Sequence, residues 1–176
     1  MKNYLITGIA GTGKSAVGDA LAAAGYDILE TDRIPANKVR YRNRFDSRTG
    51  KPSEFERGAG WEELQHVQWK INDSIIPELT RDDETIQFVC GYANNWDEYK
   101  DYFDGIFLMA ASKSTIQERL LTRTTGDWGR KHPEELKHAL ETADDFNKSI
   151  LELGATALDA ELPVETSVQV IIHAIK

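Results

Sequence analysis

The feature that most constrains this chain is a glycine-rich run, G-I-A-G-T-G-K-S, at residues 8–15, which directly follows a short apolar segment. The run matches the phosphate-binding pattern G-x-x-x-x-G-K-[ST]. Glycines allow the backbone to curl closely around phosphate oxygens with its N–H groups pointing inward. Lys14 supplies a compact positive charge, and the Ser15 hydroxyl is a ligand suited to Mg²⁺. The run therefore predicts a strand, a loop that binds a nucleoside triphosphate, and a helix whose positive N-terminal end strengthens the anion site.

Length and composition are those of one ordinary soluble domain. The chain has 176 residues, of which 40% are hydrophobic and 28% charged, enough for a full core. A formal net charge of −8 argues against general binding to nucleic acid or to a membrane surface. There is no apolar run of bilayer length and no cysteine besides Cys90, which we expect to be buried. The first apolar segment is short, so we do not expect a signal peptide. We therefore expect a cytoplasmic protein, monomeric or homodimeric, without a nucleic-acid or membrane partner.

Strand-like and helix-like patterns alternate along most of the chain, which is typical of a parallel sheet covered by helices. The expected strands are residues 4–7, 26–29, 85–90, 105–109 and 155–158. The expected helices are residues 15–24, a helix capped by Ser112, and residues 134–153 and 165–175. This order predicts an α/β fold with three α/β/α layers around a parallel five-stranded sheet.

Two stretches break the alternation within the single expected domain, residues 1–176. Residues 33–77 are too long for a simple crossover, so we expect an insertion that binds the acceptor. Residues 124–133, T-T-G-D-W-G-R-K-H-P, form a polar loop between two helices and are a candidate lid. Parallel α/β sheets bind ligands at the carboxyl ends of their strands. The loops after these strands should therefore gather around one site.

Asp32 follows the second expected strand, beside the phosphate-binding loop. A carboxylate at this point could accept a proton from an acceptor hydroxyl or help to hold Mg²⁺ through water. The alternative is an aspartate that only stabilises a turn or caps a helix. Its position at the end of a sheet strand favours the functional interpretation.

The insertion is strongly basic. Between Arg33 and Arg57 there are eight lysines and arginines but only three acidic residues, a local net charge of +5. Such a field attracts an anionic second substrate, and arginine is suited to bidentate binding of phosphate or carboxylate. Arg44 and Arg57 are the candidates for this role. The alternative is a solvated face whose arginines pair with acids elsewhere.

Three arginines lie in or beside the candidate lid. Arg119 and Arg123 share one helical face, and Arg130 lies within the loop. Phosphoryl transfer requires positive charge over the migrating group, and a closing loop can deliver it while excluding water. An exposed helix edge paired with acids is the alternative. Trp128 is a candidate lid contact, and the four histidines lack metal-ligand spacing and are expected at the surface.

Together these features resemble the P-loop small-molecule kinases, the group that includes nucleoside monophosphate kinases, shikimate kinase and gluconate kinase. The segments that carry the resemblance are G-I-A-G-T-G-K-S at 8–15, E-T-D at 30–32, F-V-C-G at 88–91, E-R-L-L-T-R at 118–123 and L-D-A-E-L-P-V-E at 158–165. The resemblance implies a P-loop NTPase fold of the nucleotide-kinase type. The chain lacks the D-G-[FY]-P-R string of nucleoside monophosphate kinases and the triple glycine of shikimate kinase, so the motifs leave the acceptor open.

The resemblance also implies roles for single positions. Asp32 would bind the acceptor or a metal-bound water, Gly91 would touch the substrate, and the neighbouring Asn94 could orient it. Arg119 and Arg123 would contact the adenine and the phosphates. The implied ATP-binding set is Gly8, Ala10, Gly11, Thr12, Gly13, Lys14, Ser15, Arg119, Arg130, Ala160 and Leu162.

The sequence thus predicts a small-molecule kinase that uses ATP and Mg²⁺ and phosphorylates a small anionic acceptor, in the first place a nucleotide or nucleoside. Lys14, Asp32 and Arg123 would carry the catalysis, and Ser15 with Asp32 would hold Mg²⁺. Two alternatives stay open. One is a kinase of a sugar acid, a cyclitol acid or another small metabolite. The other is a nucleotide-dependent switch or ATPase that acts on a macromolecular partner.

Overall fold

The centre of the protein is a parallel sheet of five strands. The computed structural model describes residues 1–32 and 39–176, so the basic positions Arg33 and Lys38 of the insertion lie outside the described residues. The strands are β1 (Lys2–Thr7), β2 (Asp27–Glu30), β5 (Ile86–Cys90), β6 (Gly105–Ala110) and β7 (Thr156–Asp159). Their order is β2-β5-β1-β6-β7, and every neighbouring pair is parallel. The predicted sheet is confirmed.

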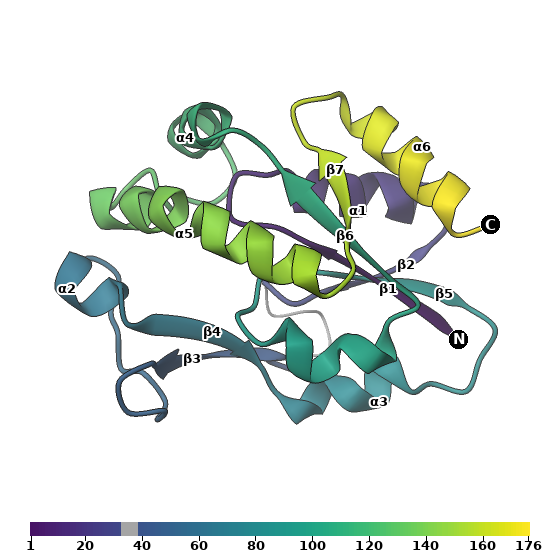
Figure 1. Ribbon diagram of the computed structural model, residues 1–176, viewed down its shortest axis with the longest axis horizontal. Coiled ribbons are helices and arrows are strands. Elements are labelled where there is room, and N and C mark those ends of the chain that lie inside the picture. Colours follow the sequence, from purple (N-terminus) through teal and green to yellow (C-terminus); the bar gives the residue numbers. More distant parts are fainter. Residues whose placement is uncertain (33–38) are drawn as a thin grey trace.

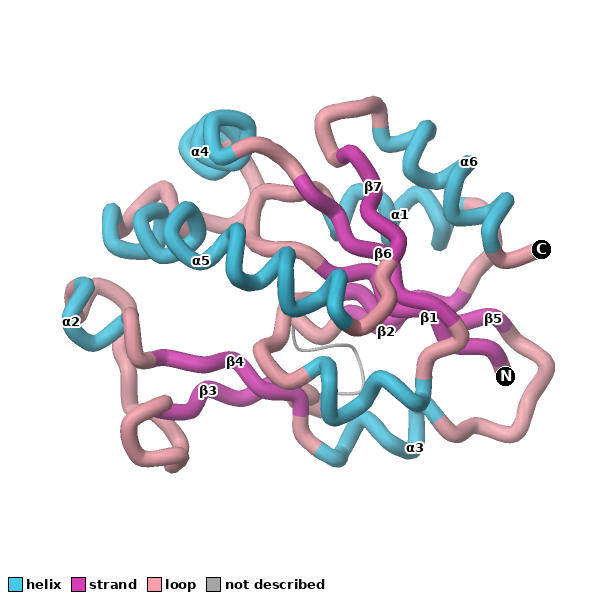
Figure 2. The backbone as a smooth tube through the Cα atoms, viewed as in Figure 1, coloured by secondary structure: helices cyan, strands magenta, loops and turns pink. Residues whose placement is uncertain are grey.

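Helices cover both faces of this sheet (Figures 1 and 2). On one face α1 (Lys14–Ala23) and α6 (Val164–Ala174) pack on Tyr4 and Ile6 of β1. On the other face α4 (Lys113–Thr122) and α5 (Pro133–Glu152) pack with Leu5 of the same strand. Because successive side chains of a strand point to opposite faces, one short apolar strand supplies both cores. The predicted three-layer α/β/α architecture is therefore confirmed.

A local sequence signal sets the start of α4. The Ser112 hydroxyl accepts a hydrogen bond from the Thr115 backbone N–H at 3.2 Å, which confirms the predicted cap of this helix. Cys90 is fully buried in β5, as expected. Among the described residues, no helix combines the length and the apolarity that crossing a bilayer requires.

The stretch that interrupts the alternation forms an arm beside the sheet. In this arm β3 (Arg42–Asp46) pairs antiparallel with β4 (Val67–Ile71), and α2 (Trp61–Leu64) lies near its tip. The connection back to β5 contains the 3-10 helix η1 (Asp73–Ile75) and α3 (Ile76–Leu79), and the 3-10 helix η2 (Trp96–Tyr102) follows β5. The arm extends away from the main sheet toward the amino end of α5 (Figure 1). The arm therefore lies beside the carboxyl ends of the strands and forms one wall of the space next to them (Figure 1).

Candidate active site

The loop between β1 and α1 has a curled conformation that depends on glycine. Gly11 and Gly13 have φ angles of 89° and 88°, a left-handed region that other residues rarely adopt. At Gly8, a Cβ atom would lie 2.5 Å from a backbone oxygen of β6 and 2.7 Å from Thr12 Oγ1. The Thr12 hydroxyl in turn donates to the Ile9 carbonyl oxygen at 2.9 Å. The backbone itself therefore forms the inner surface of the loop.

The same loop has the charge that a polyanion requires. Helix α1 begins directly after Gly13 and has no acidic residue in its first turn, so its first N–H groups and its positive dipole end face the loop. Lys14 is only 7% exposed. Its Nζ donates to the Ile9 carbonyl oxygen at 3.0 Å and lies 3.8 Å from Asp32 Oδ2. Burial lowers the pKa of Lys14, an effect that the nearby Asp32 carboxylate opposes.

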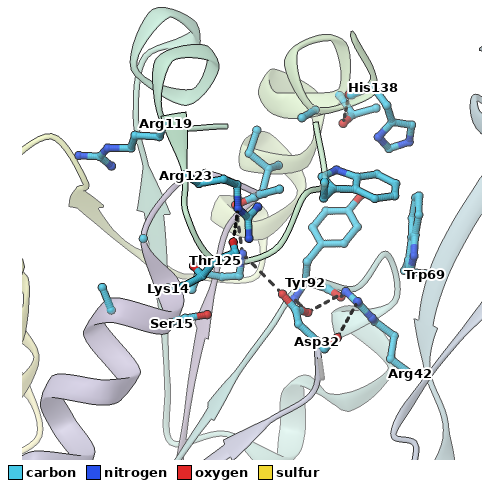
Figure 3. Close-up of a pocket in the computed structure, with 18 residues that line it drawn as sticks. Lys14, Ser15, Asp32, Arg42, Trp69, Tyr92, Arg119, Arg123, Thr125 and His138 are labelled. Carbon is cyan, nitrogen blue, oxygen red and sulfur yellow. Dashed lines mark hydrogen bonds and ion pairs between the residues drawn. The ribbon is translucent and has the colours of Figure 1, made fainter. Parts of the chain in front are cut away.

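A cavity of about 530 Å³ begins at this loop and reaches the arm and α5. Its lining runs from Gly11 and Lys14, past Asp32, to Tyr92 and His138. In Figure 3, Lys14 and Ser15 lie on one side of the site, Arg42, Tyr92 and Trp69 lie on the other, and Asp32 stands between them. The cavity therefore connects the phosphate-binding loop to a second compartment.

Asp32 is held in one orientation at the junction of the two compartments. Its Oδ1 accepts hydrogen bonds from Arg42 Nη1 at 2.7 Å and from the Tyr92 backbone N–H at 2.8 Å. Arg42 also donates to the Tyr92 carbonyl oxygen at 2.8 Å, which fixes the guanidinium. The second carboxylate oxygen, Oδ2, is therefore the one directed at Lys14. Asp32 was expected from the sequence, but its partner Arg42 was not.

Gly91 supports this junction from behind. A Cβ atom at this position would lie 1.9 Å from Thr31 Oγ1 and 3.0 Å from Asp32 Oδ1, so the close approach of the two loops requires glycine. Gly91 lines neither cavity described in this section.

The residues present fit a magnesium ion that arrives with a triphosphate. In the described part of the chain, no group of three or more His, Cys, Asp or Glu side chains could hold a metal ion. Mg²⁺ in phosphoryl-transfer sites commonly takes only one or two protein oxygens and completes its shell with phosphates and water. Ser15 and Asp32 line the same cavity as Lys14, and hydroxyl and carboxylate oxygens are ligands of the right type.

The compartment beyond Asp32 is walled by four rings, and we call it the aromatic chamber: Trp69, Tyr92, Trp128 and His138. Trp69 is edge-on to Trp128 with ring centroids 5.5 Å apart, to His138 at 5.3 Å, and to Tyr92 at 6.1 Å. Asn94 holds this wall from outside the cavity, because its Oδ1 accepts from the Trp69 backbone N–H at 2.8 Å and its Nδ2 donates to the Tyr92 hydroxyl at 3.0 Å. The structure therefore places Asn94 behind the chamber.

His138 is buried, so the expectation that all four histidines lie at the surface is wrong. It is 7% exposed and shares the inward face of α5 with Ala139, Ala143 and Phe146. The spacing of these apolar residues was the signal available in the sequence. Burial lowers the pKa of His138 to about 4, so the imidazole is neutral at pH 7.

This burial predicts a loss of stability in acid. Below pH 6.5, the ordinary pKa, the unfolded chain binds a proton that the folded chain does not accept until about pH 4. The free energy of unfolding should therefore fall by about 2 kcal/mol between pH 7 and pH 5 from this residue alone. Urea unfolding at both pH values should show a smaller pH dependence in His138→Phe. An equal change in the exposed control His173→Phe would contradict the assignment.

The arginines next to the candidate lid differ in position. Arg119 and Arg123 line the cavity, and Arg123 Nε donates to the Thr125 carbonyl oxygen at 2.7 Å. Arg130 is exposed, does not line the cavity, and donates to the Arg123 carbonyl oxygen at 2.9 Å. Arg130 therefore supports the loop that carries Arg123.

Arg44 and Arg57 line a second cavity, of about 590 Å³, which shares Asp32, Arg42, Trp69 and Trp128 with the first. Arg44 donates to the Phe55 carbonyl oxygen and lies 5.9 Å above the Phe55 ring. Arg57 pairs with Asp127 of the candidate lid at 2.6 Å and with both carboxylate oxygens of Glu135. The contacts of Arg57, but not those of Arg44, match the alternative interpretation, in which an arginine of the insertion pairs with acids elsewhere.

The pairing of Arg57 predicts a stabilising role. The Glu135 side chain is 0% exposed, whereas that of Arg57 is 37% exposed. Arg57→Ala should lower the free energy of unfolding by about 3 kcal/mol, because it leaves a buried carboxylate without its cation. Chemical denaturation would measure the loss. Arg48→Ala is the matched control, since Arg48 pairs with two acids at the surface, and an equal loss in both variants would contradict the prediction.

The loop after β7 lies apart from both cavities. Ala160 is buried and Leu162 is 48% exposed. Between them, Glu161 accepts a hydrogen bond from the Ser112 backbone N–H at 2.9 Å, which ties this loop to the start of α4. Ala10 lines the first cavity, whereas Gly8 and Thr12 do not.

Comparison with known proteins identifies the fold. The sequence matches no protein-family model, and no curated protein matches it significantly. A deoxyadenosine kinase from M. mycoides with bound dATP is similar in structure, with a TM-score of 0.55 and 16% identity over 98% of each chain. A gluconokinase from Sinorhizobium meliloti 1021 has a TM-score of 0.51 and 22% identity over 96% of this chain and 87% of that chain. The chain therefore has the fold of P-loop small-molecule kinases, as its motifs predict.

Proposed function

We propose that this protein is an ATP-dependent kinase of a small molecule. One observation carries the proposal: a phosphate-binding loop and a carboxylate meet in a single cavity, with Lys14 Nζ and Asp32 Oδ2 only 3.8 Å apart. Kinases pair these groups because the loop holds the donor while the carboxylate receives the proton of the attacking hydroxyl. The similarity in fold to a deoxyadenosine kinase and to a gluconokinase supports the same reaction class.

In the proposed reaction, the loop amides and Lys14 bind the triphosphate of ATP. The acceptor oxygen forms a bond to the γ-phosphorus as the bond to the bridging oxygen of ADP breaks, and Asp32 Oδ2 takes the hydroxyl proton. Ser15 and Asp32 would hold the Mg²⁺ that arrives with ATP, and the ion would supply positive charge to the phosphate oxygens. Arg123, with Arg119, neutralises the charge that develops on the transferred group.

Because Arg42 pairs with Asp32, the carboxylate needs little reorientation before it accepts the proton. The guanidinium and the Tyr92 N–H occupy Oδ1, so Oδ2 stays directed toward the reacting groups. Prealigned groups act without loss of conformational freedom during the reaction. Arg42 is therefore proposed as a positioning residue for Asp32.

The proposal is tested by ADP formation. The purified protein, with ATP and Mg²⁺, is supplied with nucleosides, nucleoside monophosphates, gluconate and shikimate, and ADP release is coupled to an optical readout. We expect ADP release to depend on one class of acceptor. Rapid ATP hydrolysis without any acceptor, stimulated by RNA or by another protein, would instead support the switch or ATPase alternative.

A further inference from the structure

The geometry points to an acceptor that is an uncharged aromatic alcohol, with its planar ring in the aromatic chamber and its hydroxyl at Asp32. Nucleosides are abundant metabolites with this chemistry, and we propose a nucleoside as the acceptor. His138 is the residue that we assign to recognition of the ring edge. This inference rests on the proposed kinase function, since it names the acceptor of that site. It keeps the nucleoside expected from the sequence but replaces the expected anionic acceptor with an uncharged one.

The walls of the chamber favour a flat ring. Three large aromatic side chains line it, and Trp69 and Tyr92 are fixed through Asn94. Stacking of a base on an aromatic side chain favours binding and requires no charge on the ligand. Rigid walls lose little entropy when the ligand binds.

The charges around the chamber are balanced. Arg42 is paired with Asp32 at 2.7 Å, and burial keeps His138 neutral. In the described part of the chain, the other charges lining this cavity are Lys14, Arg119 and Arg123, and in Figure 3 these lie on the side of the phosphate-binding loop. A phosphate or carboxylate buried in the chamber would therefore lose its hydration and find, among the described residues on this side of the cavity, only Arg42, which Asp32 already holds. In the adjoining second cavity, Arg40 is exposed, Arg44 already donates to the Phe55 carbonyl oxygen, and Arg57 already pairs with Asp127 and Glu135.

The chamber also offers too few polar groups for a polyhydroxylated acid. Besides the paired Asp32 and Arg42, and the hydroxyl and indole N–H groups of the walls themselves, the polar side chains that α5 contributes to the cavity are His138 and Thr142, one turn apart. The Thr142 hydroxyl already donates to the His138 carbonyl oxygen at 2.7 Å. A neutral imidazole provides one donor and one acceptor, which suits the edge of a heterocycle. Each hydroxyl of a sugar acid buried without a partner would oppose binding.

The test uses the acceptor panel together with a binding readout that needs no turnover. We expect kcat/KM for the best nucleoside to exceed that for its 5′-monophosphate, gluconate and shikimate by about 100-fold or more. Without ATP, the same nucleoside should quench tryptophan fluorescence. Trp69→Phe should reduce the quench.

His138→Phe replaces the imidazole with another aromatic ring, slightly larger, and removes both nitrogens. It should raise KM for the best nucleoside by about 10-fold or more and leave KM for ATP unchanged. It should also narrow the differences in kcat/KM among nucleosides that carry different bases. His173→Phe on the exposed end of α6 is the control. Thermal unfolding checks that Trp69→Phe and His138→Phe remain folded. If they do not, the preference of the wild-type protein among the acceptors of the panel tests the inference.

The outcomes separate the inference from the proposed function. A preference for gluconate, shikimate or a nucleoside monophosphate would overturn the aromatic-alcohol assignment and leave the kinase proposal standing. Quenching by nucleosides without phosphorylation of any acceptor would support the chamber and contradict the kinase proposal. Absence of both quenching and nucleoside phosphorylation would overturn the inference.

Discussion

Lys14→Ala should lower kcat by about 10³-fold while the protein remains folded. In the structure the ammonium group lies against the inner surface of the phosphate-binding loop, where it contacts the Ile9 carbonyl oxygen. From that position it can reach the phosphates that the loop amides bind, and a charge in such a dry site stabilises the transition state more than it would in water. Single-turnover kinetics would measure the loss, and calorimetry would measure the affinity for ATP.

The fold should survive this substitution because Asp32 keeps two other partners, Arg42 and the Tyr92 N–H. Lys148→Ala is the matched control, since Lys148 is exposed on α5, far from the loop in sequence and outside both cavities. We expect it to have the wild-type rate. If Lys14→Ala also retained that rate, the phosphate-binding loop would not be the donor site, and the central hypothesis would be lost.

The core of the fold was predictable because its signals are local. The apolar run before the glycine-rich loop, the loop itself and the helix after it are contiguous in the sequence. Each of the buried strands β5 and β6 is likewise a single short apolar run. The predicted bounds of each strand of the main sheet, and of each flanking helix for which bounds were predicted, lie within two residues of the observed bounds. Asp32 was predictable for a related reason, since the end of a parallel strand is a position that the topology brings to the ligand edge.

The aromatic chamber was not predictable because its residues come from four separate segments. Trp69 lies on β4, Tyr92 follows β5, Trp128 is in the polar loop and His138 is on α5. Their meeting depends on how the arm packs against α5, which no local pattern encodes. The same holds for charge: the basic character of the insertion was visible, but the partner of Arg57 is a glutamate 78 residues away. Composition therefore indicates the sign of the local electrostatic field, whereas tertiary packing decides which charged side chains remain free to bind a ligand.

Asp32→Asn should lower kcat by about 10²-fold, because an amide cannot accept the hydroxyl proton. The substitution preserves shape unusually well at this site. An asparagine Oδ1 can still accept from Arg42 Nη1 and from the Tyr92 N–H, the two donors that hold the carboxylate now. The amide NH₂ would then face Lys14, where the carboxylate oxygen lies 3.8 Å from Nζ in the wild type.

This prediction distinguishes two roles for the carboxylate. A proton acceptor would lower kcat at every Mg²⁺ concentration, whereas a metal-shell residue would mainly raise the Mg²⁺ concentration needed for the full rate. Initial rates measured over a Mg²⁺ series, with saturating ATP and acceptor, separate the two. Asp19→Asn, at an exposed position of α1, is the control and should match the wild type throughout. Because Arg42 and Tyr92 fix Oδ1 in either case, a full rate at high Mg²⁺ in Asp32→Asn would assign Oδ2 to the metal and exclude it as the base.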